Sequence, residues 1–238
     1  VLGVSAEEQQ QGSGIPPHCL ILDPTDQQTM LHGDLRRALG ASGAIYAHLG
    51  INRAHNPSSQ PFGQRWLTQK VGLHRYKRPL PVWILHVVSP DLRQHSRVDT
   101  RLALEELQES YQQILALLAD TIGLWEGDQR IPEVRFLPVS GQHYGGSYSV
   151  RMPRLTLLAI CRAYCSLTAT QRIRLLGNNH VQWRFCLYHA EEFFLYEAAF
   201  SNILRGSRTS SRICTGTLQL AEFMPPSPET IASFWQTF

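Results

Sequence analysis

The sequence predicts an α/β protein whose mostly parallel sheet is covered by helices on both faces. Short runs of consecutive apolar residues alternate along the chain with amphipathic segments of ten or more residues. Such apolar runs are typical of strands buried on both faces, and strands joined by helices run parallel. We expect one main domain, because 238 residues with 43% hydrophobic content can build one large core.

Four apolar runs predict the strands of this sheet. They are residues 19–22, 81–88, 133–139 and 181–189. A further segment, 214–224, is compatible with either a strand or an extended wrap around the domain. Residues 53–80 show no clear period, so they predict a long loop with at most a short strand.

Periodic segments between these runs predict the helices. Residues 100–120 place Leu104, Leu107, Tyr111, Leu115 and Leu118 on one face, which indicates an amphipathic helix. Two more helices are expected at 152–167, with a proline in its first turn, and at 190–204. Residues 32–50 are rich in small residues and predict a looser helix or helix pair.

The two ends of the chain differ from the middle in composition. Residues 1–17 are rich in Gln, Gly and Pro and predict an N-terminal arm. The domain is expected over 18–205 and a C-terminal extension over 206–238. A short helix in this extension, capped by Ser227 with Pro228 at its first position, is expected to dock on the domain.

Composition narrows the classes of partner. The net charge is +3 with a pI of about 8.7, which is below the value of about 9 typical of a dedicated nucleic-acid binder. No apolar run approaches the roughly 20 residues of a membrane span. The cysteines form no CxxC pair and most lie in apolar surroundings, which favours a reducing compartment. We expect a monomeric intracellular protein, cytoplasmic or nuclear, with no membrane partner, no metal and no cofactor.

Three predicted strands end in polar segments, at the edge where open α/β sheets bind ligands. These segments are residues 22–28, 87–91 and 138–146. The last, "PVSGQHYGG", carries Gly141, Gly145 and Gly146 just before a helix. Its backbone amides can turn inward as an anion nest, although glycines also make plain turns. It matches neither the Walker pattern nor GxGxxG, and Ser140 lies in no GxSxG elbow.

With the strand order, these motifs resemble the macrodomain family, an ADP-ribose-binding α/β/α module. "PVWILHVVSPD" looks like the central strand of that family, and "VRFLPVSGQHYGG" looks like its strand and diphosphate loop. "FCLYHAEEFFLYEAAF" looks like its last strand and helix. The resemblance spans about residues 18–204 and implies a three-layer α/β/α sandwich with a mixed, mostly parallel sheet.

The resemblance also implies a ligand and a set of contacts. The expected ligand is ADP-ribose, free or attached to protein. The diphosphate would be wrapped by the loop, Tyr144 would cover the distal ribose, and Tyr188 would border the adenine. The full set of expected ligand-binding residues is Asp23, Gly33, Ser140, Gly141, Gln142, His143, Tyr144, Gly145, Gly146 and Tyr188.

The first loop departs from the family pattern. Where macrodomains carry Asn-Ala-Ala-Asn and several glycines, this chain has Asp23-Pro24-Thr25-Asp26 and then His32-Gly33-Asp34. Asp26 with Asp34 would contact ribose hydroxyls and, if the chain is an enzyme, orient the attacking water as catalytic residues. Their charge would repel a diphosphate unless a helix terminus, Arg36 or Arg37 screens it.

Two alternative functions remain at this stage. The first is a hydrolase that acts on ADP-ribosyl or related nucleotide ester linkages. The second is an RNA-binding or scaffolding domain that kept the fold and lost the pocket. The run 64–79 mixes arginines and lysines with Trp66 and Tyr76, as in surfaces that stack single-stranded bases, although such a run is more often a solvated loop.

Overall fold

The computed structural model describes residues 18–51, 62–76, 81–95, 100–122, 131, 133–141, 144–176, 181–187, 190–205 and 218–219. The predicted N-terminal arm and the C-terminal docking helix lie outside these residues. Residues 218–219 belong to the predicted C-terminal extension, and they add a strand to the sheet.

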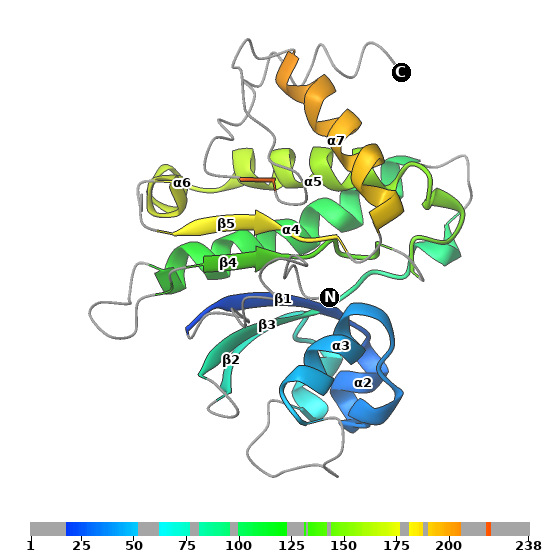
Figure 1. Ribbon diagram of the computed structural model, residues 1–238, viewed down its shortest axis with the longest axis vertical. Helices are drawn as coiled ribbons and strands as arrows, with labels where there is room; N and C mark the ends of the chain where they lie inside the picture. The colour runs from blue at the N-terminus through cyan, green and yellow to red at the C-terminus, as the bar shows by residue number, and fades with distance from the viewer. Residues whose placement is uncertain are drawn as a thin grey trace.

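The described strands form one mixed sheet in the order β2-β3-β1-β4-β5-β6 (Figure 1). They are β1 (Leu20–Thr25), β2 (Val71–Tyr76), β3 (Val82–Val88), β4 (Glu133–Phe136), β5 (Gln182–Phe185) and β6 (Leu218–Gln219). β3, β1, β4 and β5 are parallel neighbours, whereas β2 and β6 run antiparallel at the two edges. The predicted mostly parallel sheet is confirmed.

Helices follow most of the strands. The described α-helices are α2 (Gln27–His32), α3 (Gly40–His48), α4 (Thr100–Ile122), α5 (Met152–Ser166), α6 (Ala169–Leu176) and α7 (Ala190–Arg205). The periodic segments correctly predicted α4, α5 and α7, and Pro153 lies in the first turn of α5 as expected. The sequence analysis did not predict α2 and α6.

The helices lie on both faces of the sheet (Figure 1). On one face, Asp23 of β1 accepts hydrogen bonds from Ser42 and Tyr46, so this face is covered by α3. On the other face, Phe136 of β4 stacks on Tyr111 of α4 with ring centroids 5.7 Å apart. α4 in turn packs against α5 and α6. The three-layer α/β/α arrangement expected from the sequence is confirmed.

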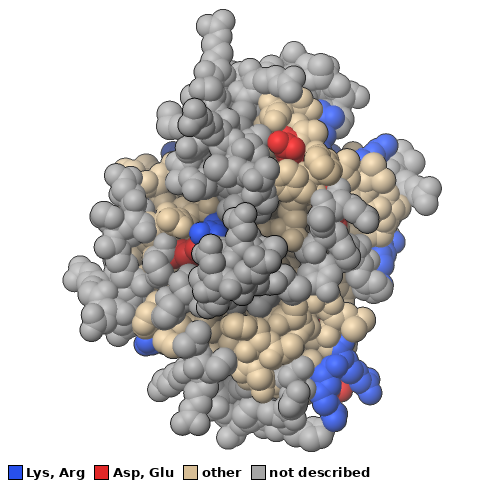
Figure 2. Space-filling view, in the orientation of Figure 1, with Lys and Arg blue, Asp and Glu red and all other residues tan. Residues whose placement is uncertain are grey.

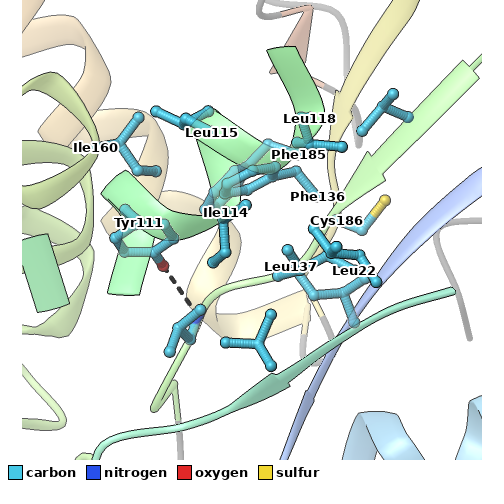
Figure 3. Packing of buried hydrophobic residues seen from close by; sticks show 14 of the residues in the cluster. Leu22, Tyr111, Ile114, Leu115, Leu118, Phe136, Leu137, Ile160, Phe185 and Cys186 are labelled. Carbon is cyan, nitrogen blue, oxygen red and sulfur yellow. Dashed lines mark hydrogen bonds between the residues drawn. The ribbon is translucent and has the colours of Figure 1, made fainter. Parts of the chain in front are cut away.

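The core between the sheet and α4 is continuous and apolar (Figure 3). Leu22, Phe136 and Phe185 point from three neighbouring strands towards Ile114 and Leu118 of α4, and all five side chains are buried. Phe136 and Phe185 also stack on each other, at 6.2 Å. This core holds the carboxyl ends of the parallel strands at one edge, where the polar loops begin.

Candidate functional site

A cleft of about 760 Å³ lies at the carboxyl edge of the parallel strands. Thr25 at the end of β1 and Asp26 after it line the cleft, as do Ser89 after β3 and Ser140 after β4. Residues of α2 and α3 and the segment between them form another wall. Ligand pockets commonly measure roughly 300–1,000 Å³, so the cleft has the size of a small-molecule site and lies at the edge that the sequence predicts.

The glycine loop borders this cleft with its first half. Ser140 and Gly141 line the cleft, and Ser140 has a left-handed φ of 56°. An anion nest needs such a left-handed residue beside a right-handed one, so that successive N–H groups point the same way. Ser140 donates its hydroxyl to the carbonyl of Pro90 at 2.7 Å, which ties the loop to the segment after β3.

The loop is also anchored by a side chain of α4. The buried Tyr111 hydroxyl of α4 accepts the backbone N–H of Val139 at 2.9 Å. Burial raises the pKa of Tyr111, so the phenol stays protonated and keeps its proton for a further hydrogen bond. The position of the loop is therefore determined by the sheet and by α4 together.

The second half of the glycine loop has a different role. Gly145 and Gly146 do not line the cleft. Gly146 has φ 52°, and a Cβ there would lie 2.9 Å from Cγ of Arg93. This glycine is therefore required by the turn and by the close approach of Arg93. Gln142 and His143 lie outside the described residues, as does Tyr188 near the end of β5.

Tyr144 lines the cleft from the same loop. Its ring carries the Arg93 guanidinium above it, 5.0 Å from the centroid, and Arg93 is held by Asp91 through two short contacts of 2.7 and 2.6 Å. Burial, followed by the charge of Asp26, raises the pKa of Tyr144. Tyr144 and Asp26 therefore lie within electrostatic reach of each other.

Asp26 lines the cleft, but its carboxylate also caps α2. One oxygen accepts the backbone N–H of Thr29 at 2.8 Å and the other accepts the Thr29 hydroxyl at 2.6 Å. A side chain that accepts the first N–H groups of a helix is a standard N-cap. Gly33, at φ 66°, ends the same helix as its C-cap and does not line the cleft.

Asp34 lines the cleft and pairs with two arginines. Its two oxygens lie 3.3 Å from Nε of Arg36 and 3.0 Å from Nε of Arg37. Arg37 itself lines the cleft. On the face drawn in Figure 2, basic side chains with an acidic one among them gather on the side where α2 and α3 lie. The arginines that the sequence suggested as screening groups thus neutralise Asp34 directly.

Asp23 is placed in the core instead of the cleft. It is fully buried, with no exposed surface, and does not line the cleft. It accepts hydrogen bonds from Ser42 at 2.5 Å, from Tyr46 at 2.6 Å and from Nδ1 of His86 at 2.7 Å. A carboxylate buried this completely needs such donors to replace water.

His86 of β3 belongs to the same buried network. Its Nδ1 donates to Asp23, so in the neutral ring Nε2 accepts from the Tyr76 hydroxyl, 3.1 Å away. Burial, followed by the charge of Asp23, raises the pKa of Tyr76, which keeps that hydroxyl protonated. With no exposed surface and both ring nitrogens hydrogen-bonded, His86 is a core residue.

Several cleft residues were not singled out in the sequence. They include Ser42, Ser89 and Glu192. Ser89 is the third residue after His86 in "HVVSPD", so its place at a strand end was a usable signal. Ser42 and Glu192 lie in helices whose approach to the strand ends depends on tertiary packing, so no local signal marked them.

Other kinds of site have no support among the described residues. No group of three His, Cys, Asp or Glu side chains there is arranged to hold a metal ion. No helix in the described ranges is long and apolar enough to cross a membrane. In the basic run, Trp66 and Tyr76 are buried, so neither ring is open to stack on a base.

The fold and the cleft define an α/β protein with a cleft at the carboxyl edge of its sheet. Similar solved structures are macrodomains of Oceanobacillus iheyensis. A point mutant is 17% identical over 80% of this chain and 87% of its own, with a TM-score of 0.48. A structure with ADPR gives 18% identity, 78% and 86% coverage and a TM-score of 0.48.

A third similar structure, the O. iheyensis macrodomain with ADP, is 17% identical over 78% of this chain and 84% of its own, with a TM-score of 0.47. No protein-family model and no curated protein matches the chain. The similar structures belong to the family that the sequence motifs indicate.

Proposed function

We propose that this protein binds ADP-ribose, free or attached to another protein, in the cleft at the carboxyl edge of its sheet. The observation that carries the proposal is the loop at 138–141, which lines a cleft of about 760 Å³ with a left-handed residue, Ser140, next to Gly141. In this proposal the backbone amides of the loop hold the diphosphate.

The charges around the cleft are compatible with an anionic ligand. Asp34 is neutralised by Arg36 and Arg37, and Arg37 reaches the cleft. Opposite charges 3.0–3.3 Å apart cancel most of each other's field at a distance. Asp26 also lines the cleft, and its N-cap contacts place it at the positive end of a helix. The repulsion that Asp26 and Asp34 exert on a diphosphate is therefore reduced.

Tyr144 supports a ribose next to the diphosphate. Its ring lines the cleft close to Ser140 and Gly141. An aromatic ring that covers a sugar face provides apolar contact while leaving the hydroxyls free to hydrogen-bond. In this proposal Tyr144 covers the distal ribose, and Tyr188 near the end of β5 borders the adenine.

Binding, without turnover, is the function that the geometry supports best. Both oxygens of Asp26 already accept hydrogen bonds from Thr29, and Asp34 is paired with two arginines. Asp26 thus serves as a helix cap and Asp34 as the centre of an ion-pair cluster. We therefore place both in the ligand site and do not assign them catalysis.

Isothermal titration calorimetry with ADP-ribose tests the proposal. We expect saturable heat with one site per chain and a rise in the unfolding temperature with ligand. Gly141→Asp should weaken binding about tenfold or more, since a carboxylate in the amide loop repels the diphosphate. Ser149→Asp is the matched control, because Ser149 is exposed and does not line the cleft.

The absence of heat and of a thermal shift at millimolar ADP-ribose would refute the proposal. Release of ADP-ribose from an ADP-ribosylated protein is measured in the same preparation. Turnover that is abolished in Asp26→Ala would make the chain a hydrolase and would overturn our assignment of Asp26.

A further inference from the structure

Ser42 of α3 lines the cleft and carries a hydroxyl group. The residue is only 5% exposed. Its Oγ donates to Oδ1 of Asp23 at 2.5 Å, and among the described residues its other polar neighbour is the carbonyl oxygen of Pro24, at 3.3 Å. Both neighbours are acceptors, and a serine hydroxyl has one proton. The proton of Ser42 is therefore committed to the protein.

Asp23 is fixed in the position that takes this proton. Its second oxygen accepts from Tyr46 and from Nδ1 of His86, at 2.6 and 2.7 Å. Burial and then the charge of Asp23 raise the pKa of Tyr46 well above its ordinary value, so Tyr46 remains a donor. Rotation of the Asp23 carboxylate would break these contacts in a fully buried site. What remains for a ligand is the lone pairs of Ser42.

We propose that Ser42 determines ligand specificity by accepting a hydrogen bond from a ribose hydroxyl, and so selects a sugar over a phosphate above α3. Asp23 acts as the positioning residue that keeps Ser42 an acceptor. The inference rests on the proposed function and goes beyond it by assigning the chemistry of one end of the cleft.

The two ends of the cleft then differ in hydrogen-bonding character. At the loop, the amides of Ser140 and Gly141 can only donate, which suits phosphate oxygens. At α3, the oxygen of Ser42 can only accept, and the Asp23 carboxylate lies directly behind it. A fully ionised phosphate group offers no proton to Ser42 and is repelled by Asp23. The cleft should therefore prefer ADP-ribose to ATP, whose terminal phosphate would occupy the place of the distal ribose.

Calorimetry with three probes, ADP-ribose, ADP and ATP, tests the inference. The wild-type chain should bind ADP-ribose at least about tenfold more tightly than ATP. Ser42→Ala should weaken ADP-ribose about fivefold, the typical effect of one hydrogen bond, and leave ADP within about twofold. Ser110→Ala is the control, because Ser110 donates to the Glu106 carbonyl on α4, away from the cleft.

Asp23→Asn tests the positioning role. The carboxamide keeps the shape of the side chain, and its NH₂ group can donate to Oγ of Ser42 while its oxygen still accepts from Tyr46 and His86. Ser42 is then free to donate to the ligand. We expect weaker binding of ADP-ribose and tighter binding of ATP than in the wild type, so that the preference between them shrinks at least fivefold.

Three results would overturn the inference. If Ser42→Ala leaves the ADP-ribose affinity unchanged, or weakens ADP and ADP-ribose binding equally, Ser42 does not recognise the ribose. The proposed function would still stand in that case. If the wild-type chain binds no ADP-ribose, both the role of Ser42 and the proposed function are refuted. Thermal unfolding is recorded for each variant, and if Asp23→Asn does not fold, the Ser42→Ala comparison between ADP and ADP-ribose decides alone.

Discussion

The buried hydrogen bond from Tyr46 to Asp23 predicts a large loss of stability in Tyr46→Phe. The hydroxyl donates to Oδ2 at 2.6 Å, and neither side chain has exposed surface. Removing one partner of a buried hydrogen bond to a charged group costs about 1.5–3 kcal/mol. Asp23 keeps Ser42 and His86 as donors, so we expect a value near the middle of this range, about 2 kcal/mol.

Tyr196→Phe is the matched control. Tyr196 is also buried, but its hydroxyl meets the neutral Thr156 hydroxyl at 3.5 Å, the outer limit of a hydrogen bond. Its loss should cost no more than about 0.5 kcal/mol. The free energy of unfolding is measured by urea titration for both variants. Equal losses would refute the reasoning, because they would mean that the charge of Asp23 contributes nothing beyond ordinary burial of a phenol.

Three further outcomes are expected. Tyr111→Phe removes the acceptor of the Val139 N–H, so the free energy of unfolding in urea titration should fall by about 1–3 kcal/mol and ADP-ribose should bind more weakly. Unchanged stability and affinity would contradict the role of Tyr111 as the anchor of the loop. Gly146→Ala should lower the free energy of unfolding by at least about 1 kcal/mol more than Gly40→Ala. Both glycines have positive φ, but only at Gly146 would the added Cβ lie 2.9 Å from a side chain. Equal losses would contradict this expectation. Burial, the neighbouring His86 and Arg65 lower the pKa of His74 to about 4 from 6.5. Between these values the unfolded chain takes up the proton first, so stability should fall on acidification from pH 6.5 to about 4, less steeply in His74→Gln; identical slopes would contradict it.

The sequence predicts the sheet and the long helices because both leave a periodic signal. α4 carries apolar residues at helical spacing over 23 residues, and the buried parallel strands are continuous apolar runs. α2 has six residues and α6 has eight. Helices of one or two turns contain too few apolar positions to establish a period, which is why neither was predicted.

The candidate site was predicted in part, for a similar reason. The edge of the sheet that carries the cleft follows from strand direction, which a run of strands and helices reveals. The roles of Asp23, in β1, and Asp26, directly after it, do not follow from sequence. Asp23 and Asp26 are three residues apart, yet one is a core carboxylate and the other an N-cap at the cleft. Their difference depends on His86 and Tyr46, which are distant in the chain.

The buried Asp23 links the stability of the fold to the properties of the cleft. Its three donors come from β3 and α3, so the same hydrogen bonds that join α3 to the sheet also orient Ser42 at the cleft. A substitution that removes the donor from Tyr46 leaves Ser42 and its ligand contact in place, but weakens the constraint on the Asp23 carboxylate. Tyr46→Phe should therefore lower ADP-ribose affinity less than Ser42→Ala does, while it lowers stability more. If Tyr46→Phe lowers both the ADP-ribose affinity and the stability more than Ser42→Ala does, or lowers both less, Asp23 does not act through Ser42.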